Sequence, residues 1–447
     1  MSQIIILLPL ATLLVLAVWT RKMAEAMVAA AALAMVILHK GNVIEGTIAS
    51  FYRALSDDSL QFCIIFLIAF GSIIRLLQES GGLQGFARFM SRFIRGPRSA
   101  LFFCWIIAGT LFVDEYLNTL TVGFTMRGIT DRCRIPREHL AFQVNAMACA
   151  LVLIVPFTSW TGFTIKLIEK EGMGFVEYVQ AIAVMFYPVI AVVLCLLLAL
   201  GLFPRLGALK KAYARVETGG PVYVPEEQGK SILEFAELDE GKISSPLNLL
   251  LPLVVIVGGA MWFDKNMLVG LLLGLICQFL LYLPQRLMSV STFFDFFFQG
   301  ASSMLTLIMV LFFGFVLGDA NEQMGVFDLV VGLASASVPA WVIPALTFLM
   351  VAALVFTTGT CWVVMLITIP IFLPLANEAG VSTVLTLGAL MSGVGMGYNL
   401  CFYADTMFLT AAGTGVNNMG VVRVSLPYAA IVGGLSLVCY LAAGVLA

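Results

Sequence analysis

The sequence Val113-Asp114-Glu115-Tyr116-Leu117-Asn118-Thr119 lies at the centre of an otherwise apolar stretch, residues 98–130. Adjacent carboxylates there are costly, because a charge at the bilayer centre costs about 2.5–3.5 kcal/mol on membrane-insertion scales. Arginines flank the stretch at 88–98 and at 127–137. Because basic flanks stay in the cytoplasm, we expect both ends of the stretch to lie there. The stretch is therefore predicted to be a re-entrant hairpin with an acidic tip inside the membrane.

The composition also indicates a membrane protein. The chain has 447 residues, of which 61% are hydrophobic and 11% charged, whereas soluble domains are roughly 45–50% apolar and about 25% charged. We therefore predict an all-α polytopic membrane protein. The net charge of −2 offers no surface for nucleic acid. His39 and His139 are the only histidines and lie far apart, so we expect neither a zinc centre nor a histidine-based enzyme.

Apolar runs long enough to cross a bilayer, which takes about 20 residues, recur along the whole chain. A second interrupted stretch, 341–376, is predicted to form another re-entrant hairpin, and polar breaks near 156–162 and 397–406 predict two broken helices. About ten transmembrane helices are expected, near 3–20, 23–39, 59–78, 138–165, 175–203, 246–263, 266–284, 300–318, 382–414 and 424–446.

The sequence also repeats internally at an offset of 243 residues. Leu8-Pro9-Leu10 aligns with Leu251-Pro252-Leu253, and Trp19 aligns with Trp262. Proline and tryptophan matches at one constant offset indicate a duplicated unit. We predict a first repeat over 1–203, a cytoplasmic linker over 204–245 and a second repeat over 246–447.

Loop charges predict the orientation of the two repeats. Each repeat would hold five spans and one hairpin, and because five is odd the second repeat is inverted, as in many secondary transporters. Residues 287–422 contain no Lys, Arg or His, so the second hairpin is expected to enter from outside. Both termini are then predicted to lie outside.

Four breaks, two at the hairpin tips and two in the broken helices, are expected to meet at mid-depth. Non-helical backbone survives in a membrane only where protein or water shelters it, and half-helix ends carry partial charges. Asp114, Glu115 and Asp405 lie in these breaks. Carboxylate and hydroxyl oxygens suit hard cations, so we predict an ion site with Asp114 and Asp405 as tentative Na+ ligands. Asp114 and Glu115 would point about 100° apart on a helix, so one is expected to face the site and the other to cap a half-helix.

Neutral polar and aromatic residues complete the predicted site. The hydroxyl and amide candidates for ion or substrate binding are Asn118, Thr119, Thr158, Ser159, Thr358, Thr360, Asn399 and Thr406. The aromatic candidates for a substrate pocket are Trp160, Tyr398, Phe402 and Tyr403.

At these breaks the sequence resembles the NhaC-type Na+/H+ antiporter family, within the ion transporter superfamily. The stretch 114–121 is similar to the family's Asp-Asp-Tyr-x-Asn-x-Leu-Thr, and 358–362 to its Thr-Gly-Thr-Ser-Trp. The stretch 156–160 is similar to the family's Pro-x-Ser-Ser-Trp. The last motif differs from the family pattern, which is Gly-Asp-x-Cys-Ser-Pro-x-Ser-Asp-Thr. Only Gly397, Asp405 and Thr406 match it, and Tyr398 stands where the family has an acid.

The resemblance implies a cation-coupled secondary transporter of the cytoplasmic membrane, most simply a Na+/H+ antiporter working by alternating access. It implies no cofactor besides the transported Na+ and H+, membrane lipid as the surroundings, and a homodimer by analogy. Fewer acids and more aromatic surface leave an alternative open, in which Na+ or H+ drives a small organic acid or amino acid. A channel or membrane-embedded hydrolase fits less well, because paired breaks suit alternating access and catalytic motifs are lacking.

Overall fold

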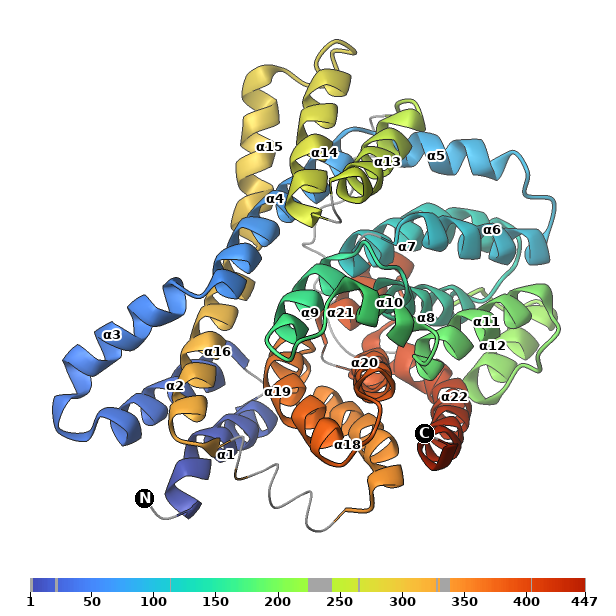
Figure 1. Cartoon of the computed structure of the whole chain (residues 1–447). Coiled ribbons are helices and arrows are strands. Elements are labelled where there is room, and N and C mark those ends of the chain that lie inside the picture. The colour runs from blue at the N-terminus through green and yellow to red at the C-terminus, as the bar shows by residue number, and fades with distance from the viewer. Residues whose placement is uncertain are drawn as a thin grey trace.

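The computed structural model describes residues 3–20, 23–112, 114–223, 243–263, 266–326, 329, 338–402 and 404–446. Within these ranges every regular element is a helix, and no strand occurs (Figure 1). Five described helices are long and apolar enough to cross a membrane, and three bent pairs raise that number to as many as eight. The predicted all-α, polytopic membrane fold is confirmed.

The described helices divide between the two predicted repeats and the linker. The first half holds α1 (Gln3–Thr20), α2 (Met23–His39), η1 (Lys40–Asn42), α3 (Val43–Leu55), α4 (Asp58–Glu79), α5 (Gly82–Ser91), α6 (Pro97–Thr110), α7 (Glu115–Arg132), α8 (Arg137–Ile154), α9 (Ser159–Glu169), α10 (Phe175–Ile182) and α11 (Phe186–Leu200). The second half holds α13 (Leu247–Trp262), α14 (Met267–Tyr282), α15 (Val290–Ser303), α16 (Leu305–Gln323), η2 (Ala340–Val342), α18 (Ile343–Thr358), α19 (Trp362–Glu378), α20 (Thr383–Leu400), α21 (Asp405–Thr414) and α22 (Asn418–Leu446).

Local chemistry sets several of the helix ends. The Asp57 carboxylate accepts a hydrogen bond from the Ser59 amide at 2.9 Å and so caps α4, as the Asn266 side chain caps α14 through the Leu268 amide at 3.1 Å. At its other end α18 stops at Gly359, whose φ of 73° is the left-handed conformation that favours glycine.

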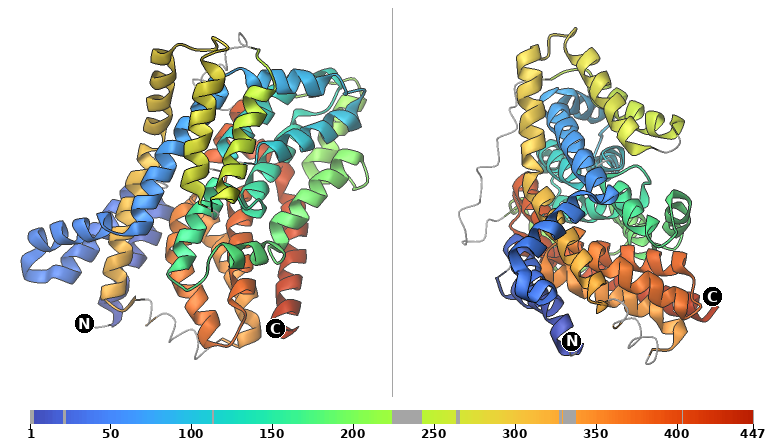
Figure 2. Two further views of the ribbon diagram at one scale, coloured as in Figure 1. Left: turned by 45° about the horizontal axis from the view of Figure 1, so that its top comes forward. Right: turned by 60° about the vertical axis from the view of Figure 1, so that its left-hand side comes forward.

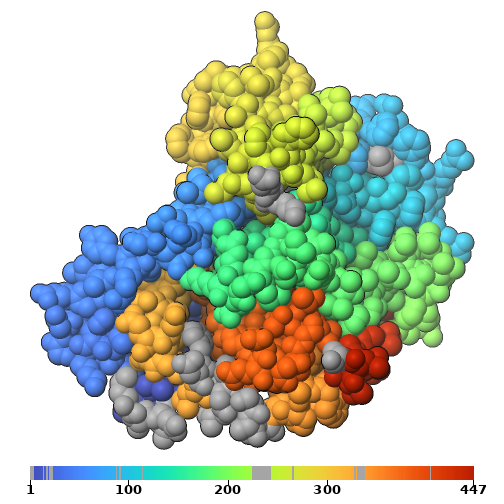
Figure 3. Space-filling view, viewed as in Figure 1, coloured from blue at the N-terminus to red at the C-terminus, as the bar shows by residue number. Residues whose placement is uncertain are grey.

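Two helices, which we call the arms, pack across the boundary between the first and second halves of the chain. Helix α4 of the first half packs against α14 and α15 of the second, and α16 of the second half packs against α2 and α3 of the first. Figure 1 shows α4 and α16 side by side at the edge of the bundle formed by α6–α11 and α18–α22, and in Figure 3 the blue segment that holds α3 and α4 forms the left-hand edge of the molecule. The exchange means that each half completes the packing of the other.

The crossing of α4 and α15 is close enough to require glycine. A Cβ atom on Gly71 would lie 2.5 Å from the carbonyl oxygen of Gly300, and one on Gly300 would lie 2.3 Å from that of Gly71. Next to this contact the Ser72 hydroxyl donates to the Phe297 carbonyl at 2.9 Å. Small residues let helix backbones approach, as is typical of packing within membranes.

The linker contains a helix that docks on the body. Helix α12 (Gly207–Glu217) buries Leu209 and Tyr213, and the Tyr213 hydroxyl lies 2.7 Å from Nδ1 of His139 on α8. The Leu206 amide donates to the Tyr428 hydroxyl on α22 at 2.7 Å. In the left-hand view of Figure 2 both termini lie at one end of the molecule, opposite the loop between α14 and α15.

The structure also contains elements that differ from the predicted spans. The predicted span 175–203 is divided into α10 and α11, which meet at a bend of 48°. Pro188 explains the division, because proline cannot donate to the carbonyl four residues earlier; the Val184 carbonyl accepts instead from the Tyr440 hydroxyl at 2.7 Å. Helix α3 was not predicted, because only part of its surface is apolar and its sequence therefore contains no continuous apolar run.

Candidate functional site

All four predicted breaks occur. They lie between α6 and α7, α8 and α9, α18 and α19, and α20 and α21. The α8–α9 pair bends by 40° and the α20–α21 pair by 49°. After each break a new half-helix begins, and these four N-termini belong to α7, α9, α19 and α21. The site is therefore built from helix starts, whose free N–H groups carry partial positive charge.

Helices α7 and α21 lie side by side and run in the same direction. At their starts the Tyr116 hydroxyl donates a hydrogen bond to Asp405. Further along, a Cβ on Gly123 would lie 2.9 Å from the Cα of Gly413, so the two backbones touch. Both N-termini consequently point to the same place.

Helices α9 and α19 form the corresponding pair under the 243-residue offset. The rings of Trp160 and Trp362 at their starts lie 5.8 Å apart, and further along the Thr164 hydroxyl donates to the sulfur of Met365 at 3.7 Å. Tyr398, at the end of α20, joins the two pairs: its ring lies 5.4 Å from that of Trp160 and its hydroxyl donates to Asp405. The four helix starts thus converge.

Asp405 is the first residue of α21 and is exposed. Its carboxylate accepts hydrogen bonds from the Tyr116 and Tyr398 hydroxyls and from the Thr406 amide, the last at 2.9 Å. Phe408, one turn further on the same face, is 41% exposed. This carboxylate is well supplied with donors and is accessible from outside the protein interior.

The two adjacent acids of the first hairpin have different environments. Asp114 caps α7, since its Oδ1 accepts from the amides of Tyr116 at 2.9 Å and Leu117 at 3.0 Å. Glu115 is fully buried and lies beside the Trp160 indole, but neither of its oxygens has a hydrogen-bond partner among the described residues. Within the described ranges no salt bridge reaches Asp114, Glu115 or Asp405.

Several predicted polar residues are engaged locally. The Asn118 amide donates to the Ala108 carbonyl at 2.7 Å and to Leu111 at 3.2 Å, which ties the two sides of the hairpin together. The Asn399 carbonyl accepts from the Asn145 amide at 2.8 Å, which joins α20 to α8. Three predicted threonines hydrogen-bond nearby backbone carbonyls: Thr119 to Glu115, Thr158 to Val152 and Thr358 to Leu354.

Other predicted residues have unused polar atoms or lie at the edge of the site. The hydroxyls of Ser159 and Thr406 and the Trp160 indole N–H are buried and have no hydrogen-bond partner in the described part of the chain. Thr360 and Phe402 are half-buried, and Tyr403 lies outside the described residues. Elsewhere in the described chain, too, no group of three or more His, Cys, Asp or Glu side chains could hold a metal ion. The Asp114–Asp405 sodium pair therefore stays a prediction.

Two residues of the site were not among the candidates. Tyr116 contacts Asp405, and Trp362 starts α19 beside Trp160 with its own N–H unpaired among the described atoms. Tyr116 lies in the motif 114–121 and Trp362 in the motif 358–362, so both are next to predicted site residues. From the sequence alone, their aromatic rings could as well have served only in packing. The fold shows that the Tyr116 hydroxyl and the Trp362 indole N–H lie at the site.

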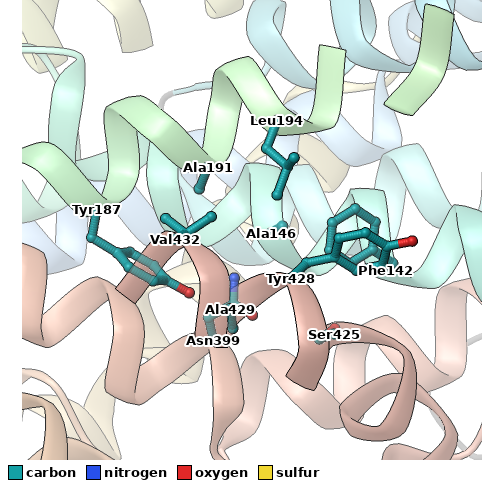
Figure 4. Close-up of a pocket in the computed structure, with 10 residues that line it drawn as sticks. All are labelled: Phe142, Ala146, Tyr187, Ala191, Leu194, Asn399, Ser425, Tyr428, Ala429 and Val432. Carbon is teal, nitrogen blue, oxygen red and sulfur yellow. The ribbon is translucent and has the colours of Figure 1, made fainter. Parts of the chain in front are cut away.

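A separate narrow pocket, with room for little more than a water molecule, lies next to the end of α20, between α8, α11 and α22 (Figure 4). Its lining is mostly apolar. Asn399 and the unpaired hydroxyl of Ser425 contribute polar atoms, and none of the three carboxylates lines it. Asn399 thus connects this pocket to the break between α20 and α21.

Solved structures share this fold. The Alcanivorax borkumensis YdaH transporter superposes with a TM-score of 0.57 at 13% identity, covering 91% of this chain and 89% of the other. Neisseria gonorrhoeae MtrF, described among a class of antimetabolite efflux pumps, gives 0.52 at 14% identity, covering 90% and 83%. The fold, with its apolar spans and broken helices, is that of a polytopic integral membrane protein.

Sequence comparison assigns the family. The Na+/H+ antiporter family model matches residues 151–445, and the chain belongs to this family. An uncharacterized protein of Haemophilus influenzae is 25% identical over an alignment of 440 positions, which covers 90% of this chain and 82% of that protein. The resemblance seen at the helix breaks is confirmed.

Proposed function

We propose that this transporter exchanges Na+ for H+ by alternating access. The observation that carries the proposal is the Asp405 carboxylate, accessible at the meeting point of four half-helices, with further carboxylates nearby and no salt bridge among the described residues. Acids inside a membrane protein that lack basic partners are typical of ion and proton pathways. A cation or a proton would supply the missing positive charge.

The repeated architecture supports the alternating part of the proposal. Under the 243-residue offset, the pair α7–α21 corresponds to α19–α9, and the arm α4 corresponds to α16. Two related units in opposite orientations offer two related conformations, one open to each side. We propose that the broken helices move against the crossed arms, and that both termini lie outside the cytoplasmic membrane.

A proteoliposome assay tests the exchange. An imposed Na+ gradient is expected to drive a pH change that a trapped dye reports, and Asp405→Asn should abolish it. Asp295→Asn, which removes an exposed carboxylate from α15, serves as the matched control and should behave like wild type. Full activity in Asp405→Asn would refute the assignment.

A second candidate function is Na+- or H+-coupled transport of a small carboxylate. The four positive helix ends and the unpaired indole N–H groups of Trp160 and Trp362 favour it, because backbone and indole donors suit an anion. MtrF, a structural neighbour, is itself described as an efflux pump for antimetabolites. Thermal stabilisation by a small carboxylate that requires either Na+ or a low pH would support this candidate. No stabilisation by any of the carboxylates under either condition would exclude it.

A further inference from the structure

Four arginines lie close together where α5 ends and α6 begins. All four side chains are exposed: Arg88, Arg92, Arg95 and Arg98. No Asp or Glu occurs between Glu79 and Asp114. We call residues 88–98 the arginine segment; it comprises the end of α5, the turn that follows and the first residues of α6. The segment therefore carries four positive charges and no acid of its own.

The turn that carries the arginines has a defined shape. The Ser99 hydroxyl accepts hydrogen bonds from the amides of Arg95 and Gly96, both at 2.9 Å. At the start of α5, the Ser244 amide of the second half donates to the Gly81 carbonyl at 3.0 Å. Helix α5 is thus held at its start, and its arginine-bearing end lies at the outer edge of the molecule (Figure 1).

The other basic flank of the first hairpin, residues 127–137, bonds to the protein itself. Arg137 forms a salt bridge with Asp131 at 2.7 Å, and Arg134 donates to two linker carbonyls at 3.2 Å. In the arginine segment, by contrast, three side chains form no salt bridge with any described residue: Arg92, Arg95 and Arg98. The positive-inside rule explains basic residues on both flanks, but not why these three have no acidic partner.

Exposed phenylalanines lie beside the arginines. Phe89 is 43% exposed and Phe93 is 51% exposed, and their rings lie 5.5 Å apart. Phe93 also stacks on Phe103 of α6, at 6.0 Å between ring centroids. Positive charge next to exposed aromatic surface matches an anionic phospholipid, in which a phosphate is joined to acyl chains. A small soluble anion would leave the phenylalanines in water.

The orientation of α5 suits a membrane surface. In Figure 1 and in the left-hand view of Figure 2, α5 runs crosswise to α14. The left-hand view of Figure 2 also shows α5 toward the end of the molecule opposite both termini, which is the end proposed to face the cytoplasm. Helices that carry basic and aromatic residues in this orientation lie in the plane of the bilayer at the level of the headgroups.

We propose that the arginine segment binds an anionic phospholipid. The lipid phosphate contacts the guanidinium groups of Arg92, Arg95 and Arg98, and the acyl chains pack on Phe89 and Phe93. Guanidinium groups suit this role because their paired N–H groups match two phosphate oxygens. This binding surface is separate from the helix breaks, and the inference goes beyond the proposed function.

Native mass spectrometry of the full-length protein in detergent tests the inference. Phosphatidylglycerol and phosphatidylcholine with the same acyl chains are titrated separately, and the affinity for the first bound lipid is measured. The wild type should prefer phosphatidylglycerol. Because each basic residue near an anionic surface strengthens binding about fivefold, the variant Arg92→Gln/Arg95→Gln/Arg98→Gln should bind phosphatidylglycerol about 100-fold more weakly. Its affinity for phosphatidylcholine should equal that of wild type.

Two further variants serve as controls. Lys210→Gln/Lys211→Gln/Arg286→Gln removes the same charge from exposed positions outside the arginine segment and should keep the wild-type preference. The charge-preserving variant Arg92→Lys/Arg95→Lys/Arg98→Lys should keep most of it. Thermal unfolding in detergent verifies that each variant is folded.

Several outcomes would overturn the inference. Equal affinity of the wild type for the two lipids would do so, even if the glutamine variant fails to fold. An unchanged preference in a folded glutamine variant, or an equal loss in the matched control, would show that the arginine segment is not the binding surface. Displacement of phosphatidylglycerol by an equal concentration of inorganic phosphate would identify a site for a soluble anion instead. None of these measurements depends on Na+-driven transport, so failure of the proposed function would leave the inference standing.

Discussion

Tyr398 stands where the resembling antiporter family carries an acid, and its hydroxyl donates to the carboxylate expected to bind the cation. The hydroxyl and a cation would compete for the same oxygen. Because a hydrogen bond to a charged group contributes about 1.5–3 kcal/mol, Tyr398→Phe should lower the Na+ concentration for half-maximal transport by about tenfold or more. Tyr116→Phe should act in the same direction. A higher half-maximal concentration would identify the hydroxyls as cation ligands.

Asp114 caps α7 through two backbone amides. Asparagine caps as well as aspartate, whereas alanine cannot, and loss of a cap costs about 1 kcal/mol. Asp114→Ala should therefore lower the free energy of unfolding by about that amount, and Asp114→Asn should leave it unchanged. Thermal unfolding in detergent measures both. Equal destabilisation by the two substitutions would show that the charge matters rather than the cap.

The sequence predicted which acids lie in the breaks but not what surrounds each. Adjacency on a helix indicated that one of Asp114 and Glu115 would cap, and the structure shows that Asp114 does. That Tyr116 reaches Asp405 depends on packing between α7 and α21, which are distant in sequence. Local pattern carries no information about such a contact.

At the scale of elements, the four site breaks were predictable because polar residues interrupt long apolar runs there. The bend before α11 was missed, although Pro188 was its signal, because the surrounding residues are all apolar. Helices α3 and α15 were missed for a different reason. Their exposed apolar residues, such as Ile44 and Phe298, are interspersed with polar ones, so no uninterrupted run marks them.

Contact between α7 and α21 depends on glycine. A Cβ on Gly123 would lie 2.9 Å from Gly413, which has no side chain to move aside, while one on Gly128 of the same helix would meet nothing within 4 Å. Gly123→Ala should push the helices apart, cost about 1–3 kcal/mol of stability and reduce transport by separating Tyr116 from Asp405. Gly128→Ala is the matched control and should be neutral. Equal transport by the two variants would contradict this account.

At the scale of the whole molecule, the halves interlock. The sequence did not predict that α4 and α16 pack across the two halves, because either half could in principle have packed on itself. An apolar run predicts that a helix is buried, but it does not predict which other helix packs against it.

Because the two halves of the chain pack into each other, we expect the protein to remain assembled and active after the linker between them is cleaved. A protease site inserted within residues 224–242 should yield, after cleavage, two fragments that co-purify in detergent and keep Na+-driven transport, because crossed arms and the α7–α21 and α9–α19 pairs hold them. An insertion without the recognition sequence controls for the added residues. Separation of the fragments would show that the contacts between halves are weak.

The same crossing has a consequence for biosynthesis. When the ribosome has delivered only the first half, α7 lacks α21 and α4 lacks α14 and α15. At that stage Glu115 lies in the bilayer without the residues of the second half that bury it in the complete protein. Folding is therefore complete only after α21 has been inserted. Nascent chains truncated ahead of α21 should therefore be substrates for membrane quality-control proteases, while full-length chains escape them.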